Sequence, residues 1–242
     1  MLTLNEVTKK FGGVTAADEV SFEVQPNKTT ALIGPNGAGK TTVFNIIAGL
    51  IKPDKGTILF EDDNILDKSA DERVNMGISR TFQKVRVFEY LTILDHFQMT
   101  EDHEDMKMFK NIFISSHPDR EKYNQTLDQF GIDEDLDTKV KDLSYGQRKL
   151  LEMAIAVQMD HKLLMLDEPV AGVNKVIQER IEELLLEFKQ DGETMLVIDH
   201  DMNFVRKLAD YIVVLDSGEL LVEGEPEEVL NHPKVLEAYL GE

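Results

Sequence analysis

The chain has 242 residues, 42% of them hydrophobic, which is enough for one domain of ordinary core size or one domain with a subdomain. Its 26 basic and 46 acidic residues give a formal net charge of −20, which serves solubility and also repels nucleic acid and anionic lipid, so a membrane association would require a protein partner. The absence of cysteine excludes thiol chemistry, and the lack of a secretory signal pattern or a long apolar run predicts a cytoplasmic protein.

Two half-buried strands are predicted at the start of the chain, Leu2–Lys10 and Val20–Val24, because apolar and polar residues alternate there. The turn between them, Lys10–Gly13, predicts a small antiparallel sheet. Phe11 lies in this turn, where an aromatic ring either packs against neighbours or offers a platform for a nucleotide base.

The stretch Gly34–Thr42 fits the phosphate-binding pattern G-x-x-x-x-G-K-[ST] at every fixed position. An apolar strand, Thr29–Ile33, precedes it, and apolar residues at helical spacing follow as far as Leu50. Glycines let consecutive backbone N–H groups turn towards one anion, and the helix N-terminus adds partial positive charge. The residues expected to bind nucleotide are Asn36, Gly37, Gly39, Lys40, Thr41 and Thr42. Kinases, GTPases and transport ATPases all use this motif, so it does not name the reaction.

Within this loop, the side chains have separate expected roles. Lys40 is predicted to reach the β- and γ-phosphates, and Thr42 to hydrogen-bond the α-phosphate. The Thr41 hydroxyl is predicted to ligate Mg²⁺.

The middle of the chain changes in character. A strand at Thr57–Phe60, a helix at Asp71–Met76 and a short strand at Gly77–Phe82 lead to Gln83. From residue 84 onwards, charged helical patches with few strand signals predict an inserted helical subdomain. The acidic run at residues 100–105 is either a metal site or, as we favour, a solvated helix terminus, since no ligand spacing repeats.

The next two segments each carry polar residues at the boundary of a predicted element. Ser144 is a good N-cap for a helix that extends to Gln158. The apolar strand after it runs into Asp167 and Glu168, and the carboxyl ends of parallel strands face the ligand, so both acids are expected beside the phosphate loop. Asp167 is therefore a predicted Mg²⁺ ligand.

The remainder of the chain is predicted to complete the same sheet. The helix Lys175–Gln190 precedes a buried strand, Thr194–Ile198, and His200 follows that strand. A lone histidine at a strand end is usually structural, but this is the third strand end directed at one crevice. A hairpin around the turn at residues 216–218 and two short helices, near 225–230 and 234–240, end the chain.

Taken together, the motifs resemble the nucleotide-binding subunit of an ATP-binding cassette transporter over essentially the whole chain. The resemblance is carried by Phe11, Gly34–Thr42, Gln83, Leu143–Gln147, Asp167-Glu168, Ala171–Asn174 and His200, in the family's order and spacing. It implies an α/β fold: a P-loop NTPase core with a mostly parallel sheet and flanking helices, an N-terminal antiparallel β subdomain, and an inserted helical subdomain. The expected boundaries within a single domain of residues 1–242 are 1–83 and 160–242 for the core and 84–159 for the helical subdomain.

The resemblance also implies roles for individual residues. Phe11 would stack on adenine, and Gln83 would join Mg²⁺ and the attacking water to the transport partner. Glu168 would be the catalytic carboxylate, and His200 would contact the γ-phosphate. Ser144, Gly146 and Gln147 would bind the γ-phosphate of ATP held by the opposite subunit.

Two departures from the family pattern concern communication between the sites. Tyr145 replaces a glycine of the family signature, and Asn174, followed by Lys175, replaces the usual acid of the loop after Glu168. Neither removes a phosphate ligand, so we expect ATP and Mg²⁺ to bind and ATP to be hydrolysed.

A narrower resemblance, to the ATPases of branched-chain amino acid importers and their urea and amide relatives, comes from Gly77–Gln83, Glu168–Asn174 and Glu237–Glu242. The chain's ending and Ile198–His200 also resemble the ATPase of lipopolysaccharide export, but Arg80–Gln83 favours the importer. The implied partners are transmembrane permeases, a second ATPase subunit (identical or not) and a periplasmic or surface solute-binding protein, with the chain peripheral on the inner face of the membrane. Two other classes fit less well: soluble cassette ATPases acting on ribosomes or DNA, because the chain is acidic and has one cassette, and small-molecule kinases, which give no reason for the residues around Ser144.

Overall fold

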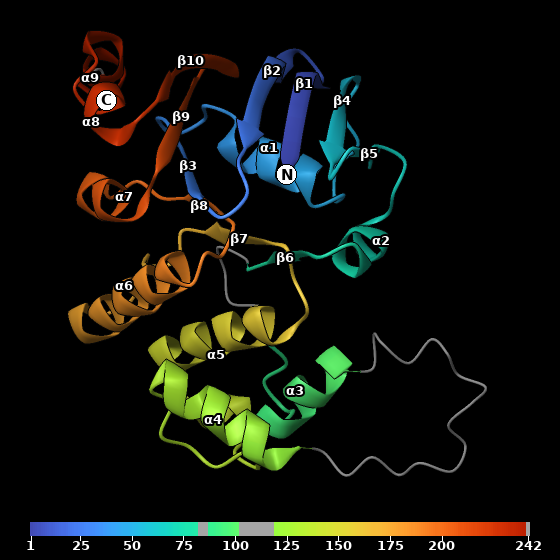
Figure 1. Ribbon diagram of the computed structural model, residues 1–242, viewed down its shortest axis with the longest axis vertical. Helices are drawn as coiled ribbons and strands as arrows, with labels where there is room; N and C mark the ends of the chain where they lie inside the picture. The colour runs from blue at the N-terminus through green and yellow to red at the C-terminus, as the bar shows by residue number, and fades with distance from the viewer. Residues whose placement is uncertain (82–86, 102–118, 241–242) are drawn as a thin grey trace.

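The computed structural model describes residues 1–81, 87–101 and 119–240. A four-stranded antiparallel sheet forms its N-terminal part, in the order β2-β1-β4-β5 (Figure 1). Its strands are β1 (Leu2–Phe11), β2 (Val14–Val24), β4 (Lys55–Phe60) and β5 (Asp63–Asn64). The predicted hairpin is present, but β2 begins six residues before the predicted start at Val20, because its first half pairs with β1 through irregular register shifts and does not alternate cleanly.

A second sheet has six strands in the order β10-β9-β3-β8-β7-β6. Neighbouring strands from β9 to β6 are parallel, and β10 is antiparallel to β9. The strands are β3 (Thr29–Ile33), β6 (Ile78–Arg80), β7 (Leu163–Asp167), β8 (Met195–Ile198), β9 (Tyr211–Asp216) and β10 (Glu219–Gly224). β3, β7 and β8 are buried along their whole length, as expected for parallel strands covered on both faces.

Helix α1 (Lys40–Ile47) packs between the two sheets, where its apolar side chains join one core with β1, β2, β4 and the parallel strands. The short helix α2 (Ala70–Asn75) is tied to the end of α1 by a buried arginine. Arg73 Nη1 donates to the carbonyl oxygens of Ile46 and Ile47 at 2.6 and 2.7 Å. The phosphate-loop helix is thus enclosed by packing and anchored at its carboxyl end.

Between β6 and β7 the described chain is helical, with α3 (Ile93–Glu101), α4 (Arg120–Phe130), a short 3-10 helix (Val140–Asp142) and α5 (Tyr145–Gln158). Figure 1 shows these helices grouped together at one end of the molecule. Ser79 Oγ in β6 donates to the Ala156 carbonyl oxygen at 2.7 Å, which joins α5 to the sheet. The inserted helical part is present as predicted; its boundaries at residues 84 and 159 stay a prediction.

The C-terminal helices are α6 (Lys175–Gln190), α7 (Met202–Leu208), α8 (Pro226–Val229) and α9 (Pro233–Leu240). The bounds of α6 match the predicted helix, and α7 was not predicted. Asp201 caps α7 by accepting the backbone N–H groups of Asn203 and Phe204 at 2.9 and 3.1 Å. In the described ranges, every helix is too short or too polar to cross a bilayer.

Candidate nucleotide-binding site

The phosphate loop joins β3 to α1 with a backbone that requires glycine. Gly34, Gly37 and Gly39 have φ angles of 146°, 83° and 99°. At Gly39 an added Cβ would also lie 2.1 Å from the Ala16 carbonyl oxygen, so β2 leaves no room for a side chain. The loop is therefore shaped by its glycines and by the hairpin beside it.

Lys40 lies folded over the loop that it follows. Its Nζ donates to the carbonyl oxygens of Gly34 and Pro35 at 2.6 and 2.8 Å. Thr41 and Thr42 occupy the first turn of α1, next to the same backbone, and Thr41 is exposed. A cation, two hydroxyl groups and a helix N-terminus thus surround one loop, which is the chemistry that binds phosphate.

Strand β8 lies beside β3, the strand that leads into the phosphate loop, and β7 lies beside β8. In the parallel register Leu32 of β3 is paired with Ile198 of β8, and Ile198 is paired with Asp167 of β7. The residues that follow these strands therefore leave the sheet at one edge. The phosphate loop, Asp167-Glu168 and His200 therefore lie at or just after the carboxyl ends of neighbouring strands, and their grouping in one crevice stays a prediction.

Asp167 is 3% exposed and forms an ion pair with Arg80, whose Nη2 lies 3.1 Å from Asp167 Oδ2. Burial raises the pKa of the Asp167 carboxyl, and the neighbouring Arg80 guanidinium opposes that rise. The Asp167 backbone N–H donates to Thr81 Oγ1 at 3.4 Å. The Asp167 carboxylate and Thr41 hydroxyl are oxygen donors of the kind that Mg²⁺ uses beside substrate phosphates, so this donor set fits the ion.

Glu168 leaves the strand in an unusual conformation. Its φ is 48°, in the left-handed region, and its backbone N–H donates to the Ile198 carbonyl oxygen at 2.8 Å. His200 Nδ1 lies 3.9 Å from Glu168 Oε1 and 3.9 Å from Asp199 Oδ1. The His200 side chain is 68% exposed, so the ring is open to a ligand on its other side.

Asp199 was not among the predicted site residues. Its Oδ1 accepts the backbone N–H groups of His200 and Asp201 at 2.8 and 2.9 Å, and burial raises the pKa of its carboxyl. The signal in the sequence was its position directly after an apolar strand, as for Asp167. Nothing in the sequence neighbourhood of Arg80 indicates its acidic partner, which lies 87 positions away.

Phe11 lies at the end of β1, in the hairpin beside the phosphate loop. Its ring is 46% exposed, and Lys9 Nζ lies 5.5 Å from the ring centroid. The exposure argues against a packing role and leaves ring surface available for a base.

The residues around Ser144 belong to the helical part. Ser144 Oγ accepts the Gln147 backbone N–H at 3.3 Å, and Gln147 Oε1 accepts the Ser144 backbone N–H at 2.9 Å, which forms a capping box at the start of α5. An added Cβ at Gly146 would lie 2.8 Å from Ile177 Cγ1, so this glycine allows α5 to approach α6 closely. Tyr145 is half exposed and borders Gly172. In the described residues, no hydrogen bond or ion pair links Ser144, Gly146 or Gln147 to the phosphate loop.

Two sequence predictions concern residues outside the described ranges. Gln83 lies in the gap at 82–86, and most of the acidic run at 100–105 lies in the gap at 102–118. Among the residues described, no group of three or more His, Cys, Asp or Glu side chains is arranged to hold a metal.

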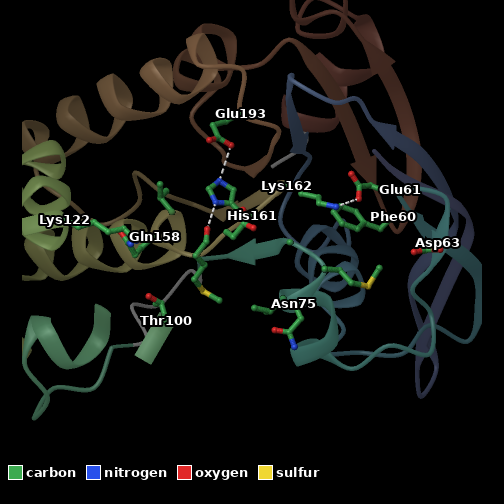
Figure 2. A pocket seen from close by; sticks show the side chains of 16 residues that line it. Phe60, Glu61, Asp63, Asn75, Thr100, Lys122, Gln158, His161, Lys162 and Glu193 are labelled. Carbon is green, nitrogen blue, oxygen red and sulfur yellow. Dashed lines mark hydrogen bonds and ion pairs between the residues drawn. The ribbon is translucent and has the colours of Figure 1, made fainter. Parts of the chain in front are cut away.

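A broad hollow of about 1000 Å³ lies where β6 and β7 begin, at the end of these strands away from Asp167 (Figure 2). It is bordered by His161 and Lys162, which precede β7, whereas Asp167 ends that strand. His161 Nδ1 lies 2.9 Å from the Met159 carbonyl oxygen, its Nε2 lies 3.2 Å from Glu193 Oε2, and Lys162 pairs with Glu61. Ion pairs thus link lining side chains to their neighbours, and none of the residues that line the hollow belongs to the phosphate loop.

Comparisons with known proteins agree with this geometry. A family model described as ABC transporter matches residues 17–171, and one described as branched-chain amino acid ATP-binding cassette transporter matches residues 219–242. The high-affinity branched-chain amino acid transport ATP-binding protein LivG of Escherichia coli K12 is 36% identical, with 100% of this chain and 98% of the relative covered.

Solved structures give the same result. The ADP conformation of an ATP-binding cassette of an ABC transporter has a TM-score of 0.84 at 33% identity, covering 100% of this chain and 99% of the other. A dimeric post-hydrolysis state of another cassette, bound to ADP and phosphate, has a TM-score of 0.80 at 25% identity, covering 93% and 99%. The chain therefore belongs to the ATP-binding cassette transporter family, as one of its nucleotide-binding, ATP-hydrolysing subunits.

Proposed function

We propose that this chain is the motor of an importer for branched-chain amino acids or related small polar solutes. The main support is the similarity to LivG over the full length of this chain. Residues 219–242 also match the family model for branched-chain amino acid ATP-binding cassette transporters. That C-terminal match also favours an importer over lipopolysaccharide export. We place the chain on the inner face of the membrane, held there by transmembrane permeases and supplied by a solute-binding protein.

The chain's residues divide the work of ATP binding. The loop amides at Asn36, Gly37 and Gly39 cradle the phosphates, Lys40 exchanges its two loop carbonyls for phosphate oxygens, and Thr42 holds the α-phosphate. Thr41, Asp167 and Gln83 hold Mg²⁺, which neutralises charge on the phosphates when it is bound. Phe11 stacks on the adenine ring.

Residues at or just after the carboxyl ends of β7 and β8 carry out hydrolysis. Asp167 faces the metal, while Glu168, turned away by its left-handed backbone, orients and polarises the attacking water. His200, beside Glu168, contacts the γ-phosphate. Ser144, Gly146 and Gln147 of a second subunit complete each site, so that ATP closes a dimer and hydrolysis reopens it.

A cavity next to the helical part fits a permease segment. It has a volume of about 310 Å³ and lies between the segment that follows α1 and the elements α2, β6, α3 and α5. Its apolar lining includes Leu50, Val74, Val87, Phe88, Met99 and Ile155. Phe88 is 59% exposed at its mouth, which suits an apolar helix of a membrane subunit.

The substrate proposal is tested by uptake in cells from which the other carriers of branched-chain amino acids have been deleted. Replacing the native gene by Glu168→Gln should reduce initial uptake of radiolabelled leucine, isoleucine and valine by about 100-fold or more, because loss of a general base slows the motor by that order. Glu179→Gln, the same chemical change on the exposed face of α6, should leave uptake unchanged. Normal amino acid uptake in Glu168→Gln cells, with urea or amide uptake lost, would move the substrate to that relative class.

A further inference from the structure

Arg80 connects three elements of the nucleotide site. From β6, its Nη1 donates to Asn45 Oδ1 in α1 at 2.8 Å, and its Nη2 lies 3.1 Å from Asp167 Oδ2 at the end of β7. The centre of its guanidinium group lies 5.5 Å from the Phe44 ring centroid, also in α1. The Arg80 side chain is 8% exposed and that of Asp167 is 4% exposed. A buried guanidinium therefore joins the phosphate-loop helix to the predicted metal ligand.

Different parts of the Arg80 guanidinium group make its contacts with Asn45, Asp167 and Phe44. Asn45 and Phe44 hold it from the α1 side, and among the described residues it bonds to one oxygen of Asp167, Oδ2. Within the described part of the chain, no hydrogen bond reaches Asp167 Oδ1. One carboxylate oxygen is thus fixed while the other is left for a ligand.

We infer that Arg80 is a positioning residue that fixes the Asp167 carboxylate, relative to α1, in the orientation that receives Mg²⁺. The inference rests on the proposed role of Asp167 as a metal ligand. Arg80 then raises the affinity for the metal–nucleotide complex and leaves the affinity for nucleotide alone nearly unchanged.

Two effects of Arg80 on a cation at Asp167 oppose each other. Its positive charge repels the ion, whereas its hydrogen bond orders the carboxylate in advance, so that less ordering remains to be done on binding. Groups that orient metal-binding carboxylates typically raise metal affinity or activity by about 10–100-fold, which exceeds the repulsion expected from a charge already paired with Asp167 and shared with Asn45. Orientation should therefore prevail.

The chain offers a matched control in Arg73. It is also a buried arginine, 2% exposed, and it also bonds to α1, but through the carbonyl oxygens of Ile46 and Ile47, and it forms no ion pair with a carboxylate among the described residues. Its replacement should disturb packing around α1 without touching Asp167. A general loosening of the fold would affect both variants alike.

The test measures the dissociation constant of a non-hydrolysable ATP analogue by calorimetry, in excess Mg²⁺ and in EDTA. The ratio of the EDTA value to the Mg²⁺ value is the metal gain. Arg80→Gln should lower the metal gain by about tenfold or more, with the EDTA value within about threefold of the parent. Arg80→Lys should lower it nearly as much, because one ammonium group cannot bridge Asn45 and Asp167 as a planar guanidinium does. Arg73→Gln should leave the metal gain unchanged even where it lowers the melting temperature.

The outcomes separate this inference from the proposed function. If Asp167→Asn abolishes the metal gain but Arg80→Gln and Arg80→Lys keep it, Arg80 does not position the ligand and the inference is wrong. An equal loss of affinity in EDTA and in Mg²⁺ would also overturn it, since that pattern describes a structural role. If Asp167→Asn keeps the metal gain, the metal site itself is wrong and this inference falls with it.

Discussion

At the scale of single residues, the two acids at neighbouring strand ends are held differently. Asp167 has Arg80 as a charged partner. Asp199, which is 1% exposed, has two backbone N–H donors on Oδ1, while its Oδ2 has no hydrogen-bond partner in the part of the chain described. Burial raises the pKa of both carboxyl groups, so each ionised form is maintained against a desolvation penalty.

Asp199→Asn should therefore stabilise the nucleotide-free protein at neutral pH. A raised folded-state pKa means that the stabilising contribution of Asp199 is present below its unfolded value, near 3.8, and is lost as pH rises through the folded value. Asparagine keeps the Oδ1 acceptor and has no charge to bury. The melting temperature should rise at pH 7, by about 2–4 °C for each kcal/mol gained, and the gain should shrink as pH falls towards 4.

Thermal unfolding across a pH series checks this expectation. Asp191→Asn, at an exposed helix end, is the matched control and should show no comparable pH-dependent gain. A lower melting temperature for Asp199→Asn at pH 7 would mean that the Asp199 charge is net stabilising.

At the scale of elements, the phosphate loop depends on β2 as well as on its own glycines. Gly37 and Gly39 both have positive φ, 83° and 99°, but only Gly39 faces the Ala16 carbonyl oxygen. Alanine at either position strains the backbone by about 1 kcal/mol. Gly39→Ala adds a clash with β2, so it should lower the melting temperature further than Gly37→Ala and should abolish ATP binding. Equal melting temperatures for the two variants would show that the loop and β2 separate readily.

The apolar cavity beneath Phe88 gives a prediction about assembly. Phe88→Asp places a charge at the mouth of this cavity and should sharply reduce co-purification with the permeases, while ATP binding stays normal. Tyr90→Asp is the control, because Tyr90 is 79% exposed and lies outside the cavity lining. Unchanged co-purification of Phe88→Asp would place the permease elsewhere.

Sequence patterns predicted the elements where local signals were strong. The strand Thr29–Ile33 and the helix Lys175–Gln190 have the predicted bounds, because uninterrupted apolar character and clear amphipathic spacing define them. The patterns missed β5, which has only two residues, and α7, whose seven residues make about two helical turns and are too few to show a clear period. They also missed the pairing of Arg80 with Asp167, which follows from β6 lying beside β7 in the sheet.

At the scale of the whole molecule, the predicted site residues of one chain fall into two sets that are not joined by a described hydrogen bond or ion pair. Phe11, the phosphate loop, Asp167, Glu168 and His200 come from the two sheets and α1. Ser144, Gly146 and Gln147 stand at the start of α5, and no described hydrogen bond or ion pair joins them to the loop. In the proposed function, a second copy supplies them. Two such chains each carry a net charge of −20, so their approach is opposed by repulsion that salt screens.

Glu168→Gln tests this dependence on a second subunit. The glutamine keeps the shape and hydrogen-bonding ability of the side chain but loses its charge and basicity, so ATP should bind and be hydrolysed very slowly. The variant should then accumulate as a closed dimer with ATP and remain monomeric without it, and added salt should increase the dimer fraction. Size-exclusion chromatography with and without ATP measures the dimer fraction. The control is Glu179→Gln, on the exposed face of α6, which should continue to hydrolyse ATP and should not accumulate as a dimer. A Glu168→Gln monomer at moderate salt with ATP shown to be bound would contradict the shared site, because ATP alone would then be insufficient to bring Ser144 of one chain to the phosphates of another.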